Sequence, residues 1–148
     1  MAKFGETSKK KLSTAERDLQ RLFEEVVKTF DCTVLYGHRT PSEQLELYKQ
    51  GRELKNGEWV LVDRTKKVTN CDGTVNVSMH NYLPSKAVDV VPYPINFNDY
   101  KRLYMFVGYV LATANALGIK VRSGADWDGD TQVNDQSFND LAHFEIID

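Results

Sequence analysis

The sequence predicts an α+β fold in which a small antiparallel sheet is flanked by helices. Two long segments, residues 19–30 and 103–117, repeat apolar side chains at helical spacing. Short runs rich in β-branched and apolar residues separate and follow them, at 32–36, 86–91, 119–122 and 143–146. With 148 residues, of which 41% are hydrophobic and 27% charged, we expect one core and a single domain over residues 1–148.

The first expected helix follows a capping box, Ser13-Thr14-Ala15-Glu16. In such a box the Ser13 oxygen accepts an early backbone N–H while Glu16 reaches back to the cap. The lysines at 9–11 then form a solvated helix entry, because lysine is mostly exposed. The apolar positions of this helix are assigned to the core: Leu19, Leu22, Phe23, Val26, Val27 and Phe30.

A strand over 32–36 is expected to end at Gly37-His38-Arg39-Thr40. A second capping box follows, from Thr40 to Glu43, with Pro41 at the first helical position and Gly51 as the stop. Arg39 therefore stands where a strand passes into a helix. Such junctions often carry function because a rigid element positions the side chain.

The segment from 51 to 77 gives weaker signals. Residues 59–62 and 67–69 are expected to pair as a small hairpin, and Asp72-Gly73 indicates a turn. We expect this insertion to lie at the rim of the cleft.

The remaining elements carry the candidate chemistry. In the strand over 86–91, Ala87 and Asp89 point to one face, and a buried aspartate is costly unless it is paired or bound to a cation. Asn98 or Asp99 caps the next helix and Gly118 ends it. In the last strand His143 and Glu145 share a face, with Glu145 expected to support a histidine and Asp140 to lie in the preceding turn.

Two histidines and two carboxylates together indicate a catalytic zinc site. His80, Asp89 and His143 supply three ligands, which leaves zinc a fourth position for water. Zinc lowers the pKa of bound water to about 7 and polarises a substrate carbonyl. A carboxylate outside the coordination sphere must then take the water proton and pass it to the leaving amine. Asp140 is the candidate for that base.

A second metal is a weaker hypothesis. Asp126, Asp128 and Asp130 alternate as in the first half of a calcium loop. The glycine required at position six and the glutamate at position twelve are absent, since residue 137 is serine. A solvated acidic loop explains the pattern at least as well as calcium.

Charge and composition exclude several classes. A net charge of −2 gives no basic surface for nucleic acid. We expect no membrane insertion, because no stretch is long enough to span a bilayer, and the N-terminus lacks the apolar region of a signal peptide. Cys32 and Cys71 are expected to be reduced thiols.

The segments SMHNYLPSKAVDV (78–90) and DLAHFE (140–145) resemble the zinc D-alanyl-D-alanine carboxypeptidase and L-alanyl-D-glutamate endopeptidase family. GHRT (37–40) is similar to that family's strand-end arginine motif. GADW (124–127) and the opening Phe4-Gly5 with Ser8 and Leu12 resemble phage endolysins, so the similarity covers nearly the whole chain. One departure is that eight residues separate His80 from Asp89 where the family usually has six, and this longer loop includes Pro84, with Ser85 near the place of the family's glycine.

The resemblance implies a hedgehog/D-Ala-D-Ala-peptidase-like fold and a zinc-dependent endolysin that hydrolyses the L-Ala–D-Glu bond of peptidoglycan stem peptides. The implied roles are zinc binding by His80, Asp89 and His143, proton transfer by Asp140, oxyanion stabilisation by Arg39 and substrate placement by Ser78. We expect a monomer that is made in the host cytoplasm and acts on the cell wall after release.

Three alternatives stay open at this point. The first is a D-Ala-D-Ala carboxypeptidase, which needs the same zinc chemistry. The second is a catalytically silent wall-binding module, against which the presence of both Asp140 and Arg39 argues. The third is a metal-dependent nuclease, suggested by His80-Asn81 alone and disfavoured by the lack of a basic stripe.

Overall fold

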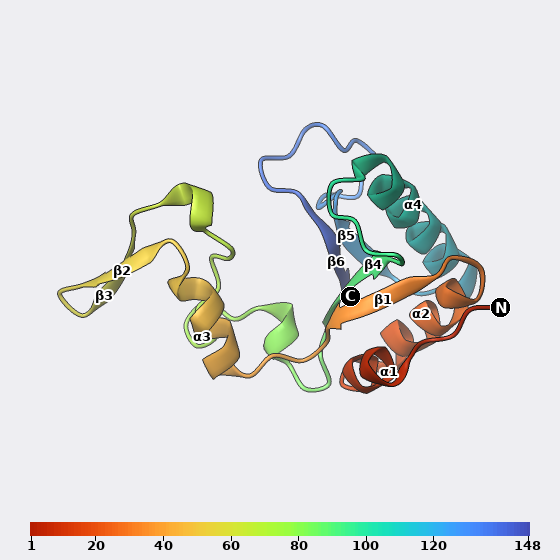
Figure 1. Cartoon of the computed structure of the whole chain (residues 1–148), viewed down its shortest axis with the longest axis horizontal. Helices are drawn as coiled ribbons and strands as arrows, with labels where there is room; N and C mark the ends of the chain where they lie inside the picture. Colours follow the sequence, from red (N-terminus) through yellow and green to blue (C-terminus); the bar gives the residue numbers. More distant parts are fainter.

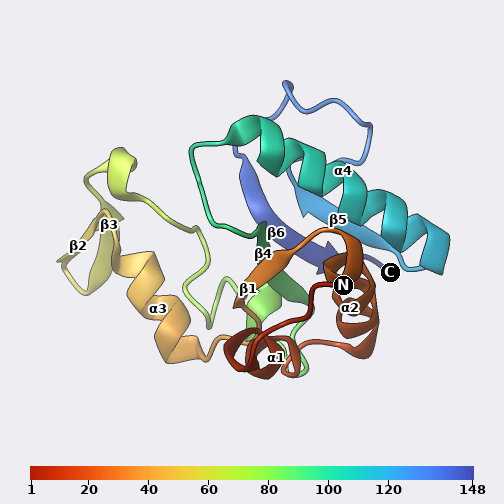
Figure 2. The same cartoon turned by 45° about the vertical axis from the view of Figure 1, so that its right-hand side comes forward.

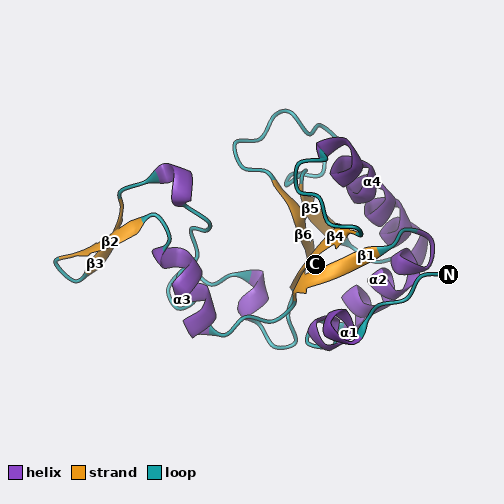
Figure 3. Ribbon diagram, in the orientation of Figure 1, coloured by secondary structure: helices purple, strands orange, loops and turns teal.

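A four-stranded antiparallel sheet forms the centre of the molecule, in a computed structural model that describes residues 1–148 (Figures 1 and 3). Its strands are β1 (Cys32–Tyr36), β4 (Ala87–Pro92), β5 (Val121–Gly124) and β6 (Asp140–Ile146). Their order across the sheet is β1-β4-β6-β5, so the two strands that carry Asp89 and His143 are central neighbours. The α+β class and the small antiparallel sheet expected from the sequence are confirmed.

Two helices, α2 (Arg17–Thr29) and α4 (Tyr100–Leu117), cover one face of the sheet (Figure 1). Phe144 of β6 is fully buried between them, with its ring centroid 5.4 Å from Phe23 and 6.2 Å from Phe106. A buried phenylalanine stabilises a fold by about 1.5–3 kcal/mol through the apolar surface it removes from water. Because side chains alternate along a strand, the residues on either side of Phe144 and of Val88 and Val90 point to the opposite face, away from these helices.

The N-terminal helix α1 (Glu6–Leu12) was not expected from the sequence. Phe4 and Leu12 are buried in the core, and Ser8 Oγ accepts the backbone N–H of Val34 at 3.1 Å. This helix therefore lies along β1, the edge strand, and supplies a side-chain partner to its backbone. The lysines at 9–11 are exposed, as expected, but they occupy the last turn of α1 rather than a helix entry.

The predicted capping box at Ser13 is wrong. Ser13 follows α1 as its C-cap, and α2 begins four residues later with Glu16 as its N-cap and no side-chain cap bond. The physical reason is local competition, because the Ser13 and Thr14 hydroxyls donate backwards to the carbonyls of Lys10 and Lys11. Five of the six apolar positions predicted for this helix are nevertheless in the core, and the sixth, Phe30, is the C-cap and packs against the core while partly buried.

The helix α3 (Pro41–Lys49) begins with the predicted capping box. Thr40 Oγ1 accepts the backbone N–H of Glu43 at 3.2 Å, and Glu43 Oε1 accepts that of Thr40 at 3.2 Å. Gly51, just beyond the C-cap, has a φ of 83°, the left-handed conformation that glycine adopts at low cost. These contacts fix the chain direction directly after Arg39.

The predicted hairpin is wrong in its pairing. The strands are β2 (Arg52–Lys55) and β3 (Glu58–Leu61), joined by Asn56 and Gly57 with φ values of 52° and 81°. Asn-Gly is the preferred pair for such a turn, so the signal was present in the sequence and was missed. The 3₁₀ turn η1 (Arg64–Lys66) follows, and residues 67–69 form no strand.

Figures 1 and 2 show α3 and the β2–β3 hairpin projecting from the sheet, well away from α4. The predicted turn at Asp72-Gly73 is confirmed, since Gly73 has a φ of 91° and the Asp72 carboxylate accepts three following backbone N–H groups. A second 3₁₀ turn, η2 (Met79–Asn81), brings the chain back to the sheet before β4.

The boundaries of α4 follow the sequence signals. Asp99 is the N-cap and accepts the backbone N–H of Arg102 at 3.2 Å, while Gly118 ends the helix with a φ of 71°. The following strand is two residues later than expected, since β5 spans Val121–Gly124. None of the helices is both long and apolar enough to cross a membrane. Both cysteines are free, as predicted, and Cys32 is buried.

Candidate metal centre and active site

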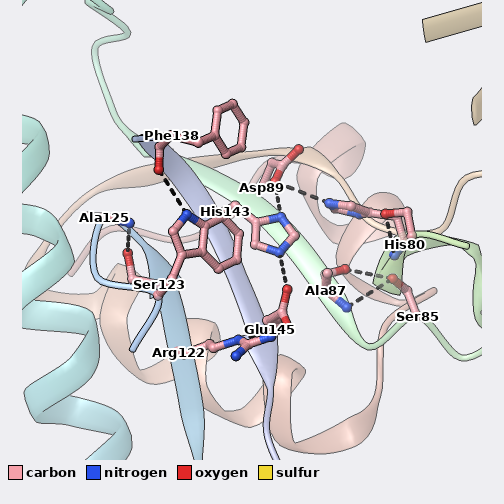
Figure 4. Close-up of polar contacts among 12 residues, drawn as sticks. His80, Ser85, Ala87, Asp89, Arg122, Ser123, Ala125, Phe138, His143 and Glu145 are labelled. Carbon is pink, nitrogen blue, oxygen red and sulfur yellow. Dashed lines mark hydrogen bonds and ion pairs between the residues drawn. The ribbon is translucent and has the colours of Figure 1, made fainter. Parts of the chain in front are cut away.

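Three sequence-predicted ligands meet on the face of the sheet opposite α2 and α4. His80 comes from η2, Asp89 from the middle of β4, and His143 from β6 directly opposite Asp89. All three side chains are buried, and their ligand atoms lie within 4.8 Å of one another, close enough to hold one metal ion. Figure 4 shows contacts from both imidazoles to the Asp89 carboxylate.

One carboxylate oxygen is shared by both rings. His80 Nε2 lies 3.2 Å and His143 Nδ1 3.3 Å from Asp89 Oδ1. The other nitrogen of each ring has its own acceptor, 2.7 Å away: the Gly37 carbonyl for His80 Nδ1 and Glu145 Oε1 for His143 Nε2. Those acceptors take up the outer nitrogens, so the inner nitrogens are the ones that face Asp89 and are placed to bind a metal ion.

Three acceptors that converge in this way need a positive charge among them. Burial by itself lowers the pKa of His143, but hydrogen bonds with Asp89 and Glu145 outweigh it and raise that pKa to about 9. Burial would raise the pKa of Asp89, yet hydrogen bonds from His143 and His80 hold it well below its usual range. The site therefore stabilises a cation at its centre, either a proton on His143 or a metal ion that displaces it.

Glu145 is the predicted partner of a histidine, and the structure confirms the contact. Besides His143, its carboxylate bonds Arg122, whose Nη2 lies 2.9 Å from Glu145 Oε2. Burial would raise the pKa of Glu145, but the hydrogen bond with His143 and the charges of His143 and Arg122 lower it. An ionised Glu145 holds the His143 ring in one orientation, as acceptors beside ligating histidines do.

Arg39 reaches the same site from the loop between β1 and α3. Its Nη2 donates to Asp89 Oδ2 at 2.8 Å, and its guanidinium lies 4.5 Å from the ring centre of Tyr36. The arginine thus binds the Asp89 oxygen that the histidines leave free. Its Nε is buried without a hydrogen-bond partner.

Gln44 is a residue that sequence reasoning missed. It is fully buried in α3, and its Oε1 accepts Arg39 Nη1 at 3.4 Å while its Nε2 donates to the Cys71 carbonyl at 3.1 Å. Gln44 is the fourth residue of α3, and nothing in the sequence sets it apart from the other polar residues of that helix. It ties the projecting segment to the arginine beside the candidate metal ligands.

Asp140 is the first residue of β6 and pairs with Gly124, whereas a position in the preceding turn was expected. That expectation is wrong because β5 extends to Gly124 and carries the pairing further. Burial, followed by repulsion from Asp89, raises the pKa of Asp140. A carboxyl group whose pKa is raised beside the cluster is suited to accept and return a proton.

Ser78 caps η2 rather than pointing freely into solvent. Its Oγ accepts the backbone N–H of His80 at 3.2 Å, and its own N–H donates to Asn81 Oδ1 at 2.8 Å. Asn81 Nδ2 donates in turn to the Arg39 carbonyl at 3.0 Å. The short turn therefore fixes His80 and Arg39 relative to each other, a role of Asn81 that was not predicted from the sequence.

The three aspartates of the acidic loop do come together, with carboxylate oxygens within 4.8 Å of one another. Asp126 is buried, and its two oxygens accept the backbone N–H groups of Gly129 at 3.1 Å and Thr131 at 2.9 Å. Asp128 and Asp130 are exposed. These bonds order the loop by themselves, so calcium binding stays a hypothesis.

The fold and the site together define a class, an α+β domain with a candidate single-metal centre. Within it, the chain belongs to the phage L-alanyl-D-glutamate peptidase family, whose model matches residues 1–147. This confirms the family resemblance seen in the sequence.

Individual relatives agree with that membership. The chain is 26% identical over 153 residues to the L-alanyl-D-glutamate peptidase of Escherichia phage T5, with 98% of each chain covered. It is also similar in structure to the Serratia marcescens L-Ala D-Glu endopeptidase ChiX, with a TM-score of 0.65 at 21% identity. That comparison covers 97% of this chain and 89% of the other, and it shows that the two share a fold.

Proposed function

We propose that residues 1–148 act as one monomeric, zinc-dependent domain that hydrolyses the L-Ala–D-Glu bond of peptidoglycan stem peptides. The observation that carries the metal is the convergence of His80 Nε2 and His143 Nδ1 on Asp89 Oδ1, with the outer nitrogens of both rings already bonded. The scissile bond comes from the family that the chain belongs to.

The donor set favours zinc among the biological metals. Two imidazole nitrogens and one carboxylate oxygen suit zinc, whereas calcium and magnesium prefer oxygen ligands only. Zinc–ligand bonds of about 2.0–2.1 Å at tetrahedral angles place neighbouring ligand atoms about 3.3 Å apart. The two nitrogen–oxygen separations of 3.2 and 3.3 Å match that edge length.

Zinc in this position would lower the pKa of a bound water and polarise the L-alanine carbonyl. Asp140 would take the proton from the attacking water, because its carboxyl group lies beside the cluster and has a raised pKa. It would then deliver that proton to the amine of D-glutamate as the peptide bond breaks. One residue serves as base and then as acid, because the proton that it takes from water is the proton that the leaving amine needs.

Arg39 is proposed to stabilise the oxyanion that develops on the carbonyl oxygen. Two of its N–H groups bond Asp89 and Gln44 and the Tyr36 ring lies beside it, which preorganises the guanidinium next to the reaction centre. Ser78 is proposed to help place the substrate, and its observed bond to the His80 backbone sets the position of its hydroxyl.

Digestion of purified peptidoglycan tests the proposed bond. Mass spectrometry with amino-terminal labelling should reveal new D-glutamate amino groups, and a chelator should abolish their appearance. Release of free D-alanine with no new D-glutamate termini would instead establish the carboxypeptidase. No cleavage by zinc-loaded protein would overturn the proposed peptidase and favour the wall-binding module.

A further inference from the structure

The segment between β5 and β6 leaves the sheet directly beside the candidate site. Backbone pairing of the two strands stops at Gly124 and Asp140. The excursion from 127 to 139 forms no strand or helix of its own. Contacts of side chains at its two ends must therefore set the position of its C-terminal end, which leads into Asp140.

Trp127 joins the two ends of this excursion. Its indole Nε1 donates to the Phe138 carbonyl at 2.9 Å. The two rings are stacked, with centroids 6.3 Å apart and planes inclined by 13°. Gln136 reinforces the closure, because its Oε1 accepts the Trp127 backbone N–H and its Nε2 donates to the Gly124 carbonyl, both at 2.9 Å. Phe138, labelled in Figure 4, stands two residues before Asp140.

The same indole also contacts the candidate ligand His143. The two ring centroids are 5.4 Å apart with planes inclined by 42°. The Arg122 guanidinium lies 5.7 Å from the indole centre, and Arg122 bonds Glu145, the acceptor of His143 Nε2. Trp127 and Glu145 therefore restrain one imidazole, the first against its ring and the second at its outer nitrogen.

Ordinary packing does not account for this position. Trp127 is only partly buried and is not among the residues of the hydrophobic core. Its contacts instead link the loop, His143 and the chain leading to Asp140. A partly buried tryptophan whose indole N–H is hydrogen-bonded and whose ring lies beside Phe138 and His143 is well restrained.

We propose that Trp127 is a positioning residue for the reaction, which sets the orientation of His143 and the distance of Asp140 from the three ligands. The inference rests on the proposed function, since it assigns to Trp127 the alignment of that function's base with its metal centre. A misplacement of about 1 Å in such an arrangement lowers the rate by about 10²-fold.

Two substitutions at Trp127 separate alignment from folding. Trp127→Phe keeps an aromatic ring against His143 and Phe138 but removes the indole donor, and we expect kcat to fall about five- to ten-fold with KM unchanged. Trp127→Ala removes both, and kcat should fall about 10²-fold. The matched control is Trp59→Phe in the projecting hairpin, where the ring contacts Lys49, and it should keep the kcat of the unchanged protein.

The same variants give a readout that does not depend on catalysis. The chain has two tryptophans, so Trp59→Phe leaves Trp127 as the only indole and Trp127→Phe leaves Trp59. Addition of zinc to metal-free Trp59→Phe protein should change its indole emission. The midpoint of this change should coincide with the midpoint of metal binding. The emission of Trp127→Phe protein should stay constant over the same titration.

The outcomes are distinct. Reduced kcat per zinc-loaded, folded molecule in Trp127→Phe, together with a zinc-dependent emission of Trp127, supports the proposal. Unchanged kcat in Trp127→Phe, or emission of Trp127 that ignores zinc, overturns it, even if Trp127→Ala fails to fold. If no variant cleaves peptidoglycan but the emission of Trp127 follows zinc, the proposed function fails while the contact between Trp127 and the metal centre stands.

Discussion

Gly124→Ala is the smallest change that should displace the candidate base. A Cβ atom at Gly124 would lie 2.2 Å from the Asp140 carbonyl oxygen and 2.8 Å from the Asp140 Cβ. Its three nearest neighbours all belong to Asp140, and two of them are backbone atoms that no side-chain rotation can move. The added methyl group therefore pushes on one residue, the proposed proton carrier.

The size of the effect follows from the overlap. Carbon and oxygen pack at about 3.3 Å or more, so the main chain of Asp140 must move by about 1 Å. A displacement of that size costs about 10²-fold in rate, and forcing an extra methyl group into a packed site costs about 1–3 kcal/mol of stability. His143 lies three residues further along β6, paired with Asp89, so the metal ligands should keep their places.

The assay compares Gly124→Ala with Gly108→Ala. Gly108 lies in α4, where an added Cβ meets nothing within 4 Å, and the same substitution should stabilise the helix by about 1 kcal/mol. We expect Gly124→Ala to retain its metal and lose about 10²-fold in kcat, and Gly108→Ala to keep full activity. Normal turnover by Gly124→Ala at normal metal content would refute the close coupling of Gly124, Asp140 and the reaction.

Four further predictions concern the same residues and their surroundings. Asp140→Asn should keep its metal and lose about 10²–10⁴-fold in rate, measured by peptidoglycan cleavage and metal analysis, and near-normal turnover would require another base. In metal-free protein the pKa of His143 is raised to about 9, against about 6.5 in the unfolded chain, so protonated His143 should stabilise the fold by about 3 kcal/mol. This stabilisation is complete below pH 6.5 and is lost as the pH rises through 9. Thermal melting between pH 6 and 10 measures this, and a flat profile would contradict it. Calcium, if the loop over 126–138 binds it, should raise the melting temperature, and calorimetry without heat or shift would dispose of that hypothesis. Burial raises the pKa of Cys32 to about 12, so a thiol reagent should label Cys71 alone in folded protein and both cysteines after denaturation.

The candidate site was the part of the molecule most readable from the sequence. His80, Asp89 and His143 were assigned together because their residue types suit zinc and because the segments at 78–90 and 140–145 resemble the motifs of the family. Glu145 followed from the two-residue period of a strand, which places it on the face of His143. These predictions needed no knowledge of how the rest of the chain packs.

Features that depend on tertiary contacts could not be obtained in this way. Gln44 acquires its role only when α3 lies beside Arg39, and Trp127 only when the chain returns at Phe138. Helix α1 was missed because its few apolar residues become informative only once β1 lies beside them. By contrast, the capping box at Ser13 failed on a local choice, since the hydroxyl bonds a preceding carbonyl instead of a following N–H.

Metal analysis of the purified protein and its histidine variants tests the central claim most directly. Elemental analysis after dialysis should find one zinc per chain in the unchanged protein and almost none in His80→Ala or His143→Ala, because two remaining ligands hold zinc weakly. Circular dichroism on the same samples identifies any variant that has unfolded. Full zinc content in both folded variants, or no zinc in the unchanged protein after incubation with the metal, would contradict a centre built from His80, Asp89 and His143.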